Sequence, residues 1–78
     1  MTIEQLRKLH EATPFVPFTI YLADGRAIPV VSREFLSFSP SGRTIIVHHG
    51  ANDNYSVIDL LLVTELETHG RPRSRKAT

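Results

Sequence analysis

Residues 15–30, FVPFTIYLADGRAIPV, constrain the fold of this 78-residue chain more than any other stretch. Apolar and polar side chains alternate there, which places three apolar side chains on one face of an extended strand: Phe18, Ile20 and Leu22. Asp24 and Gly25 follow, and this pair is typical of a tight turn because Asp tolerates and Gly favours positive φ. The stretch therefore predicts a β-hairpin with one buried face.

The residues before the hairpin predict a short helix. Thr2 and Gln5 have the spacing of a capping box, in which each side chain bonds the backbone N–H of the other residue. Ile3, Leu6 and Leu9 then fall on one stripe of a helix over residues 3–12. Pro14 and Pro17 end it, because proline lacks an N–H and disfavours helix in the preceding residue.

The rest of the chain alternates between short extended segments and turns. The return strand, residues 26–31, contains Pro29, which must lie at an edge, bulge or bend because proline cannot donate to a ladder. After that bend extended structure resumes over 34–39, with Leu36 and Phe38 on one face. Further strands are expected at 44–49, 55–59 and 61–67, the last after a helical turn at 59–61. With the bent second strand counted once, five strands follow the helix.

These elements indicate one mainly β domain with an N-terminal helix (α+β). Five short antiparallel strands in so few residues bury both faces most economically by curling into a five-stranded SH3-like or Sm-like small barrel, with the helix over one mouth. Phe18 and Phe38 are expected in its core. The domain covers residues 1–68, and 69–78 form a disordered tail without large apolar residues.

Charge divides the chain in the same place. Residues 1–68 hold five basic and eight acidic side chains, whereas the last ten residues carry Arg71, Arg73, Arg75 and Lys76 and no acid. The chain has no cysteine, which removes disulfides and thiolate chemistry. No apolar run reaches the roughly 20 residues of a membrane span, and the N-terminus lacks the apolar region of a secretory signal, so the expected location is cytoplasmic without membrane association.

The order of helix, proline-rich segment, FTIYLADGR, bent second strand and final strand resembles the bacterial Sm-like RNA chaperones of the Hfq family. That resemblance implies an Sm-like fold, ring assembly by strand pairing between subunits, and a nucleic-acid contact at Tyr21. Where the family has a Tyr-Lys-His signature, this chain has Tyr55, Ser56 and Val57. The resemblance therefore supports the fold more than the RNA activity.

The chain also resembles a set of short bacterial proteins of unassigned activity. They share a Pro-Phe-x-Pro-Phe opening, an Asp-Gly-Arg turn and a final Asp-Leu-Leu run. The match is carried by these residues: Pro14, Phe15, Pro17, Phe18, Asp24, Gly25, Arg26, Asp59, Leu60 and Leu61.

Catalytic and metal-binding groups form no recognisable motif. His48 and His49 are neighbours on a strand, so we expect one to face solvent and the other the barrel wall, which prevents them from sharing a metal ion. Ser56, His48 and Asp59 could be drawn as a triad, but no nucleophile elbow or phosphate-binding loop accompanies them. We expect no enzyme activity, no cofactor and no metal site.

The sequence thus favours a small interaction or assembly module that self-associates and binds a protein partner, since a chain of this length is marginally stable alone. An Sm-like RNA-binding ring, acting in post-transcriptional regulation, is the alternative. The candidate contact residues for either partner are Tyr21, Arg26, Phe35, Arg71, Arg73, Arg75 and Lys76. Phe35 is included because it is expected on the face of the strand that Leu36 does not occupy, where an aromatic side chain creates an exposed apolar patch.

Overall fold

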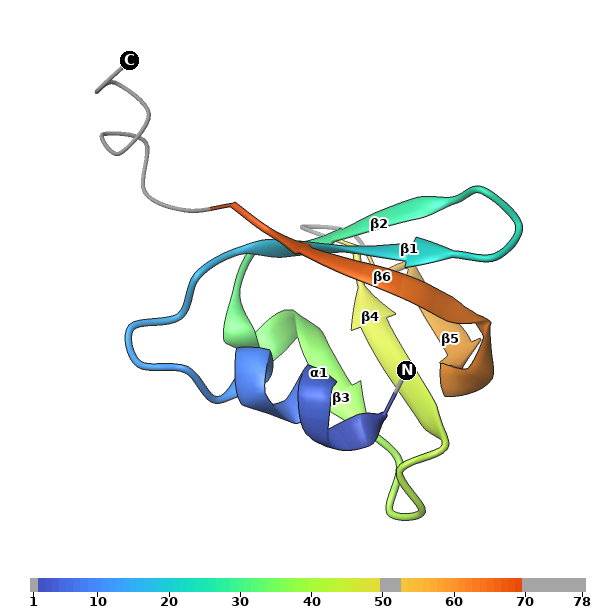
Figure 1. Cartoon of the computed structure of the whole chain (residues 1–78), viewed down its shortest axis with the longest axis horizontal. Helices are drawn as coiled ribbons and strands as arrows, with labels where there is room; N and C mark the ends of the chain where they lie inside the picture. The colour runs from blue at the N-terminus through green and yellow to red at the C-terminus, as the bar shows by residue number, and fades with distance from the viewer. Residues whose placement is uncertain (1, 50–52, 70–78) are drawn as a thin grey trace.

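The computed structural model describes residues 2–49 and 53–69 (Figure 1). One helix, six strands and two short 3-10 helices follow one another along the described chain: α1 (Ile3–His10), β1 (Phe18–Leu22), β2 (Ala27–Val30), η1 (Arg33–Phe35), β3 (Leu36–Phe38), β4 (Thr44–His48), β5 (Tyr55–Asp59), η2 (Leu60–Leu62) and β6 (Val63–Thr68). The mainly β composition with one N-terminal helix is as predicted.

The five-stranded closed barrel is wrong. The six strands form two open antiparallel sheets of three strands, in the orders β2-β1-β6 and β3-β4-β5. Figure 1 shows the two sheets facing each other, with α1 beside β3. The protein is therefore a packed pair of small sheets and not a five-stranded SH3-like or Sm-like barrel.

Two short helical turns explain why the sheet does not close. The expected bent second strand is interrupted at η1, where the Phe35 N–H donates to the Ser32 carbonyl and leaves the ladder. At the other end, η2 carries the chain from β5 in one sheet to β6 in the other, and the Asp59 side chain caps this turn by accepting from the Leu61 N–H. Among the residues described, β5 and β6 form no pair that would complete a barrel.

The predicted hairpin forms, with Ile20 opposite Ile28 and the Leu22 N–H donating to the Arg26 carbonyl. Gly25 has φ of 95°, whereas Asp24 has no positive φ and instead accepts from the Arg26 backbone and side chain. The turn therefore needs left-handed backbone only at the glycine.

Pro29 lies in the edge strand β2, opposite Thr19. Leu22 and Arg26 form a hydrogen-bonded pair of the ladder, and such pairs alternate along antiparallel strands. The backbone groups of Ile28 and Val30 therefore face β1, whereas those of Pro29 face the open edge. The missing N–H thus costs no ladder hydrogen bond. Of the three positions expected from the sequence, an edge, a bulge or a bend, Pro29 therefore occupies the edge.

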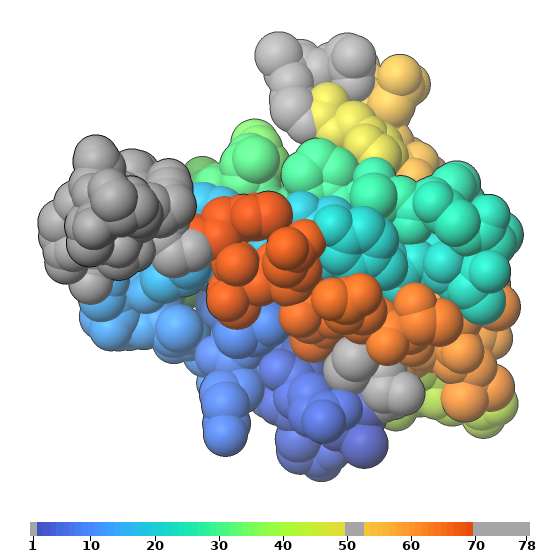
Figure 2. Space-filling model, turned by 45° about the horizontal axis from the view of Figure 1, so that its top comes forward, coloured from blue at the N-terminus to red at the C-terminus, as the bar shows by residue number. Residues whose placement is uncertain are grey.

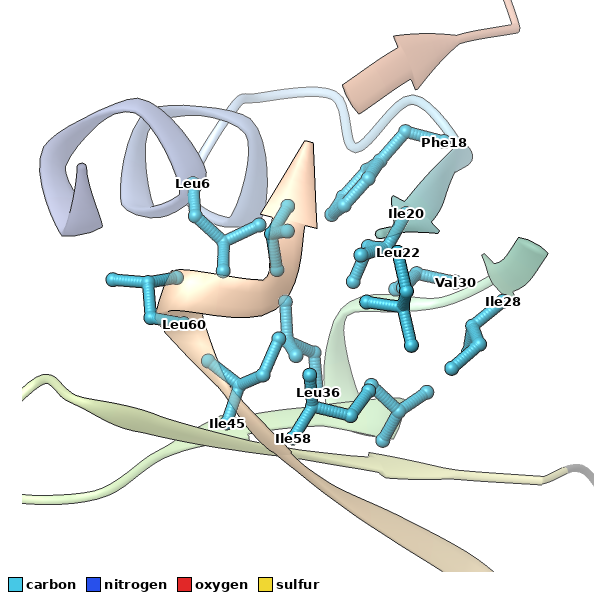
Figure 3. Close-up of a cluster of buried hydrophobic side chains, with 12 residues drawn as sticks. Leu6, Phe18, Ile20, Leu22, Ile28, Val30, Leu36, Ile45, Ile58 and Leu60 are labelled. Atoms are coloured by element: carbon cyan, nitrogen blue, oxygen red, sulfur yellow. The ribbon is translucent and has the colours of Figure 1, made fainter. Parts of the chain in front are cut away.

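The core lies between the two sheets and under α1. Sheet β2-β1-β6 contributes the alternating residues that the hairpin pattern predicted, and β4 and β5 contribute Ile45, Val47 and Ile58. Leu6 of α1 is completely buried, and Figure 3 shows it reaching toward Leu60 and the side chains of both sheets. The complete buried apolar set is Leu6, Phe18, Ile20, Leu22, Ile28, Val30, Leu36, Ile45, Val47, Ile58, Leu60 and Val63.

Two positions differ from the expected burial. Phe38 is only half-buried, because its ring lies at the rim of the core under His10 and Arg7 of α1. Thr19 is buried although its position in the alternation is polar, and its hydroxyl is satisfied by a 2.7 Å hydrogen bond with His69. The His69 N–H also donates to the Pro17 carbonyl, so His69 extends the contacts of β6 with β1.

Helix α1 is fixed at both ends. At its start the Thr2–Gln5 capping box forms as predicted. At its end the Arg33 guanidinium donates to the carbonyls of His10 and Ala12, and the His10 ring donates to the Arg33 carbonyl at 3.0 Å. The Arg33 guanidinium also lies 5.7 Å from the centre of the Phe15 ring. These contacts tie the end of α1 to η1.

Replacing Leu6 with alanine should destabilise the fold by about 2 to 5 kcal/mol, because the change removes buried methyl groups and leaves a cavity between the sheets. Urea unfolding followed by circular dichroism measures this loss. Leu61→Ala makes the same chemical change at a side chain that is 82% exposed, and it should cost less than about 0.5 kcal/mol. Similar losses in the two variants would contradict the assigned core.

Arg33→Met should lower the free energy of unfolding by about 1 to 2 kcal/mol, because it keeps the apolar stem but removes the donors that bind the end of α1. Arg26→Met is the matched control, since the Arg26 side chain bonds only Asp24 among the described residues, in an exposed ion pair of 2.9 Å, and such pairs contribute about 0 to 1 kcal/mol. Thermal and urea unfolding of both variants compare the two arginines. Equal losses would mean that Arg33 does not hold α1.

Candidate interaction surface

Several large apolar side chains remain on the surface after the core has formed. Val31 is 57% exposed, Tyr55 is 59% exposed and Val57 is 61% exposed. Single exposed apolar residues are normal on a protein surface, so their arrangement decides whether they matter.

One group surrounds a cavity at the end of β2. The cavity has a volume of about 300 Å³ and is lined by Pro29, Val31, Phe35, His48 and His49. In Figure 2 the end of β4 and the start of β5, in yellow and light orange, stand beside the green residues that end β2. The cavity therefore joins the edge of one sheet to the end of the other.

The second group lies on the outer face of sheet β3-β4-β5. Alternation along β4 and β5 directs Ile45 and Ile58 inward, so Tyr55 and Val57 point outward, opposite His48 and Ile46 respectively. The His48 and Tyr55 rings are 5.9 Å apart between centroids. Since His48 also lines the cavity, the two groups are continuous. We call this surface the apolar strip, formed by Pro29, Val31, Phe35, His48, Tyr55 and Val57.

The expected placement of the two histidines is wrong in one respect. Both are exposed and both line the same cavity, so neither packs in the core. The reason is that His49 follows the last residue of β4: it keeps the side of the sheet that alternation predicts, beside Ser56, but it lies past the end of the buried core. His49 instead forms a 2.7 Å hydrogen bond with the Ser56 hydroxyl.

The triad drawn from the sequence is not assembled as drawn. His49, and not His48, is the histidine bonded to Ser56. The Asp59 carboxylate accepts from the Leu61 N–H at the start of η2. In the part of the chain that the structure describes, no cluster of three or more side chains suitable for a metal ion is present. No helix among these residues is long and apolar enough to cross a membrane.

Phe35 is the predicted contact residue that joins the apolar strip. It is half-buried in η1 and lines the cavity, as expected for an aromatic side chain opposite Leu36. Its position depends on η1, which the Arg33 contacts tie to α1. The fold thus supports one wall of the cavity from the helix side.

Tyr21 and Arg26 lie away from the strip, in an acidic neighbourhood. The Tyr21 hydroxyl donates to Glu67 at 2.6 Å, and Arg26 is paired with Asp24. The bond to Glu67 and the charge of Glu65 raise the pKa of Tyr21 above its ordinary value of 10.0. Carboxylates beside this ring repel phosphate groups, so the surroundings do not favour the RNA contact, which stays a prediction.

The remaining predicted contacts lie outside the described residues: Arg71, Arg73, Arg75 and Lys76. A second, smaller hollow of about 240 Å³ lies at the opposite end of β5, between Gly42, Arg43, Asp59, Leu60 and Leu61. It does not include any residue predicted as a contact.

Sequence reasoning did not select Val31, Tyr55 and Val57, which belong to the apolar strip. A usable signal exists in β4 and β5, where apolar residues occupy both faces of the strands instead of one. Ile46 and Val57 lie opposite each other on the outer face, while Ile45 and Ile58 form the corresponding inner pair. A two-sided apolar pattern in an antiparallel sheet indicates that the outer face also contacts something.

Comparisons with known proteins leave the family assignment open. No family model matches the chain, and neither the curated proteins nor the solved structures include a significant match to it. The resemblances drawn from the sequence therefore stay predictions.

The phenol of Tyr21 should lose its proton only above its ordinary pKa, because ionisation breaks the bond to Glu67 and places a phenolate beside two carboxylates. Any stability from this bond is present below the ordinary pKa and lost as the pH rises past the raised one. Absorbance titration of Tyr55→Phe isolates Tyr21, since the chain has two tyrosines. Adding Glu67→Gln should lower the pKa of Tyr21, and an unchanged pKa would contradict the contact.

Proposed function

We propose that this chain is a small, non-enzymatic protein-interaction module that binds partner proteins through the apolar strip. The observation that carries the proposal is the continuity of the strip, from the cavity at the end of β2 to the outer face of β4 and β5. Extended apolar patches on a soluble protein are typical of contact surfaces.

The composition of the strip suits protein recognition. It combines aromatic rings with β-branched side chains and includes no carboxylate, and aromatic residues are enriched at the centres of protein interfaces. The cavity offers an apolar pocket with two imidazoles at its wall, which fits an apolar or aromatic side chain with a polar group near it.

The strip is built on supported backbone. Tyr55 and Val57 belong to a strand paired over its whole length with β4, and Phe35 is held by η1. A contact surface on fixed elements loses little conformational freedom on binding, which favours affinity. These features support recognition of a folded or extended protein partner.

Val31→Asp tests the proposal, because it places a charge beside the cavity without touching the core. The tagged chain is used to recover proteins from a lysate of the cells that encode it, and the recovered proteins are quantified. Proteins bound through the strip should fall at least tenfold, since burying an unpaired carboxylate costs more than the about 1.4 kcal/mol that a tenfold change represents.

Ala27→Asp is the matched control. Ala27 is exposed at the start of β2, the edge strand that Val31 follows, but it does not line the cavity. It should recover the same proteins as the unmodified chain. The proposal is wrong if Val31→Asp also recovers them unchanged, or if both variants lose them equally.

A further inference from the structure

Two open sheets leave four strand edges, and a strand edge pairs readily with another chain unless something prevents it. Edge β2 carries Pro29, whose backbone nitrogen faces outward and has no N–H to donate to another strand. Edge β3 is only three residues long and lies beside α1, where His10 and Arg7 contact Phe38. Both edges are therefore poor sites for strand pairing.

Edge β6 is protected by charge. Glu65 and Glu67 are two residues apart and exposed on the outer face, so they share one side of the strand. A second strand with acidic residues placed against them would bring carboxylates together, and like charges directly opposite each other destabilise a sheet.

Edge β5 has none of these protections. It has five residues, YSVID, with no proline and a single charge, at Asp59. Its outward side chains at Tyr55 and Val57 are largely exposed and belong to the apolar strip. A proline, a neighbouring helix or a pair of charges protects each of the other three edges. β5 is therefore the edge strand best able to pair with a strand of another chain.

Hydrogen bonds at both ends of the β4–β5 ladder show which backbone groups face this edge. The Leu60 N–H donates to the Arg43 carbonyl, and the His49 N–H donates to the Asn54 carbonyl. Because hydrogen-bonded pairs alternate in an antiparallel ladder, Ser56 and Ile58 face β4, whereas the backbone groups of Tyr55, Val57 and Asp59 face outward. Within the described residues, none of these three outward N–H groups has a bonded acceptor.

We infer that β5 pairs with β5 of a second copy of this chain, antiparallel and centred on Val57. The inference rests on the proposed function, because it makes a second copy one of the partners that the surface around Val57 binds. The result is a two-fold dimer in which the two sheets β3-β4-β5 join into one sheet of six strands.

The edge is complementary to itself in this register. Val57 lies opposite Val57 of the second copy, and Tyr55 lies opposite the second copy's Asp59, so no two like charges meet. The Asp59 carbonyl is used by the turn of η2, which leaves about four hydrogen bonds between the two edges. The two apolar strips then adjoin on one face and form a single surface with two cavities.

The dimer should form reversibly, with a dissociation constant roughly in the micromolar range, since a five-residue edge buries less than the about 800 Å² per partner of a standard interface. Analytical ultracentrifugation of the full chain should show a mass that rises with concentration and stops at two copies.

A cysteine at the centre of the pair tests the register directly, because the chain has no cysteine of its own. Opposite residues of a hydrogen-bonded pair have Cα atoms about 5.5 Å apart, which suits a disulfide. Val57→Cys should therefore give a covalent dimer under mild oxidation at least tenfold faster than Leu61→Cys. Leu61 is more exposed, at 82%, but lies far from the two-fold axis of the pair.

Proline substitutions test the edge itself. Val57→Pro removes an outward N–H but no bond to β4, as Pro29 does in β2, so it should remain folded by circular dichroism and sediment as a monomer at every concentration. Ala27→Pro makes the same change on the edge that Pro29 already blocks, and it should associate as the unmodified chain does. If Val57→Pro does not fold, the inference is tested by comparing the rates of disulfide formation of Val57→Cys and Leu61→Cys.

The inference is overturned if the unmodified chain stays a monomer, if Val57→Cys crosslinks no faster than Leu61→Cys, or if a folded Val57→Pro still associates. An assembly larger than a dimer, in which Val57→Cys forms no disulfide between copies, would mean head-to-tail pairing and would also overturn it. Loss of partner proteins from Val31→Asp without self-pairing leaves the proposed function intact, whereas self-pairing with recovery unchanged by Val31→Asp contradicts the proposed function alone.

Discussion

The fold depends on burying the inner faces of two small sheets with very little chain. Each sheet has three strands and would be marginal alone, because three short strands stay folded in water only when one face is covered. The sheets cover each other, and Leu6 from α1 fills the space where they diverge. Since α1 has only eight residues, its position depends on the capping box at its start and on Arg33 at its end.

The open arrangement of the two sheets also determines which groups lie on the surface. Because the two sheets do not close into a barrel, their edges stay open, and each must be kept from pairing with other chains or be used for pairing. Pro29, α1 beside β3, and the two glutamates of β6 serve the first purpose. The break at η1 that prevents closure also turns Phe35 toward the cavity. Core geometry and contact surface therefore have a common origin in the two short helical turns.

Local patterns predicted the elements well and their assembly poorly. The alternation at Phe18, Ile20 and Leu22 and the capping box depend on neighbouring residues, and both are confirmed. The break at η1 is stabilised by contacts between Arg33 and residues more than twenty positions earlier, so no local pattern reveals it. Without that break, residues 26–39 read as one bent strand and the chain as a closed barrel.

The candidate site was harder to predict for a related reason. Phe35, which the sequence selected because it lies beside Leu36 in the chain and was expected on the other face, does line the cavity, and its role as a contact stays a prediction. Val57 was not selected, because the apolar residues of β4 and β5 lie on both faces, and sequence alone does not show which face the other sheet covers. Only the partner sheet decides that Ile45 and Ile58 are inside. Once that choice is made, Tyr55 and Val57 are left outside on an edge without protection, and the sequence feature that obscured the fold becomes the feature that points to a partner.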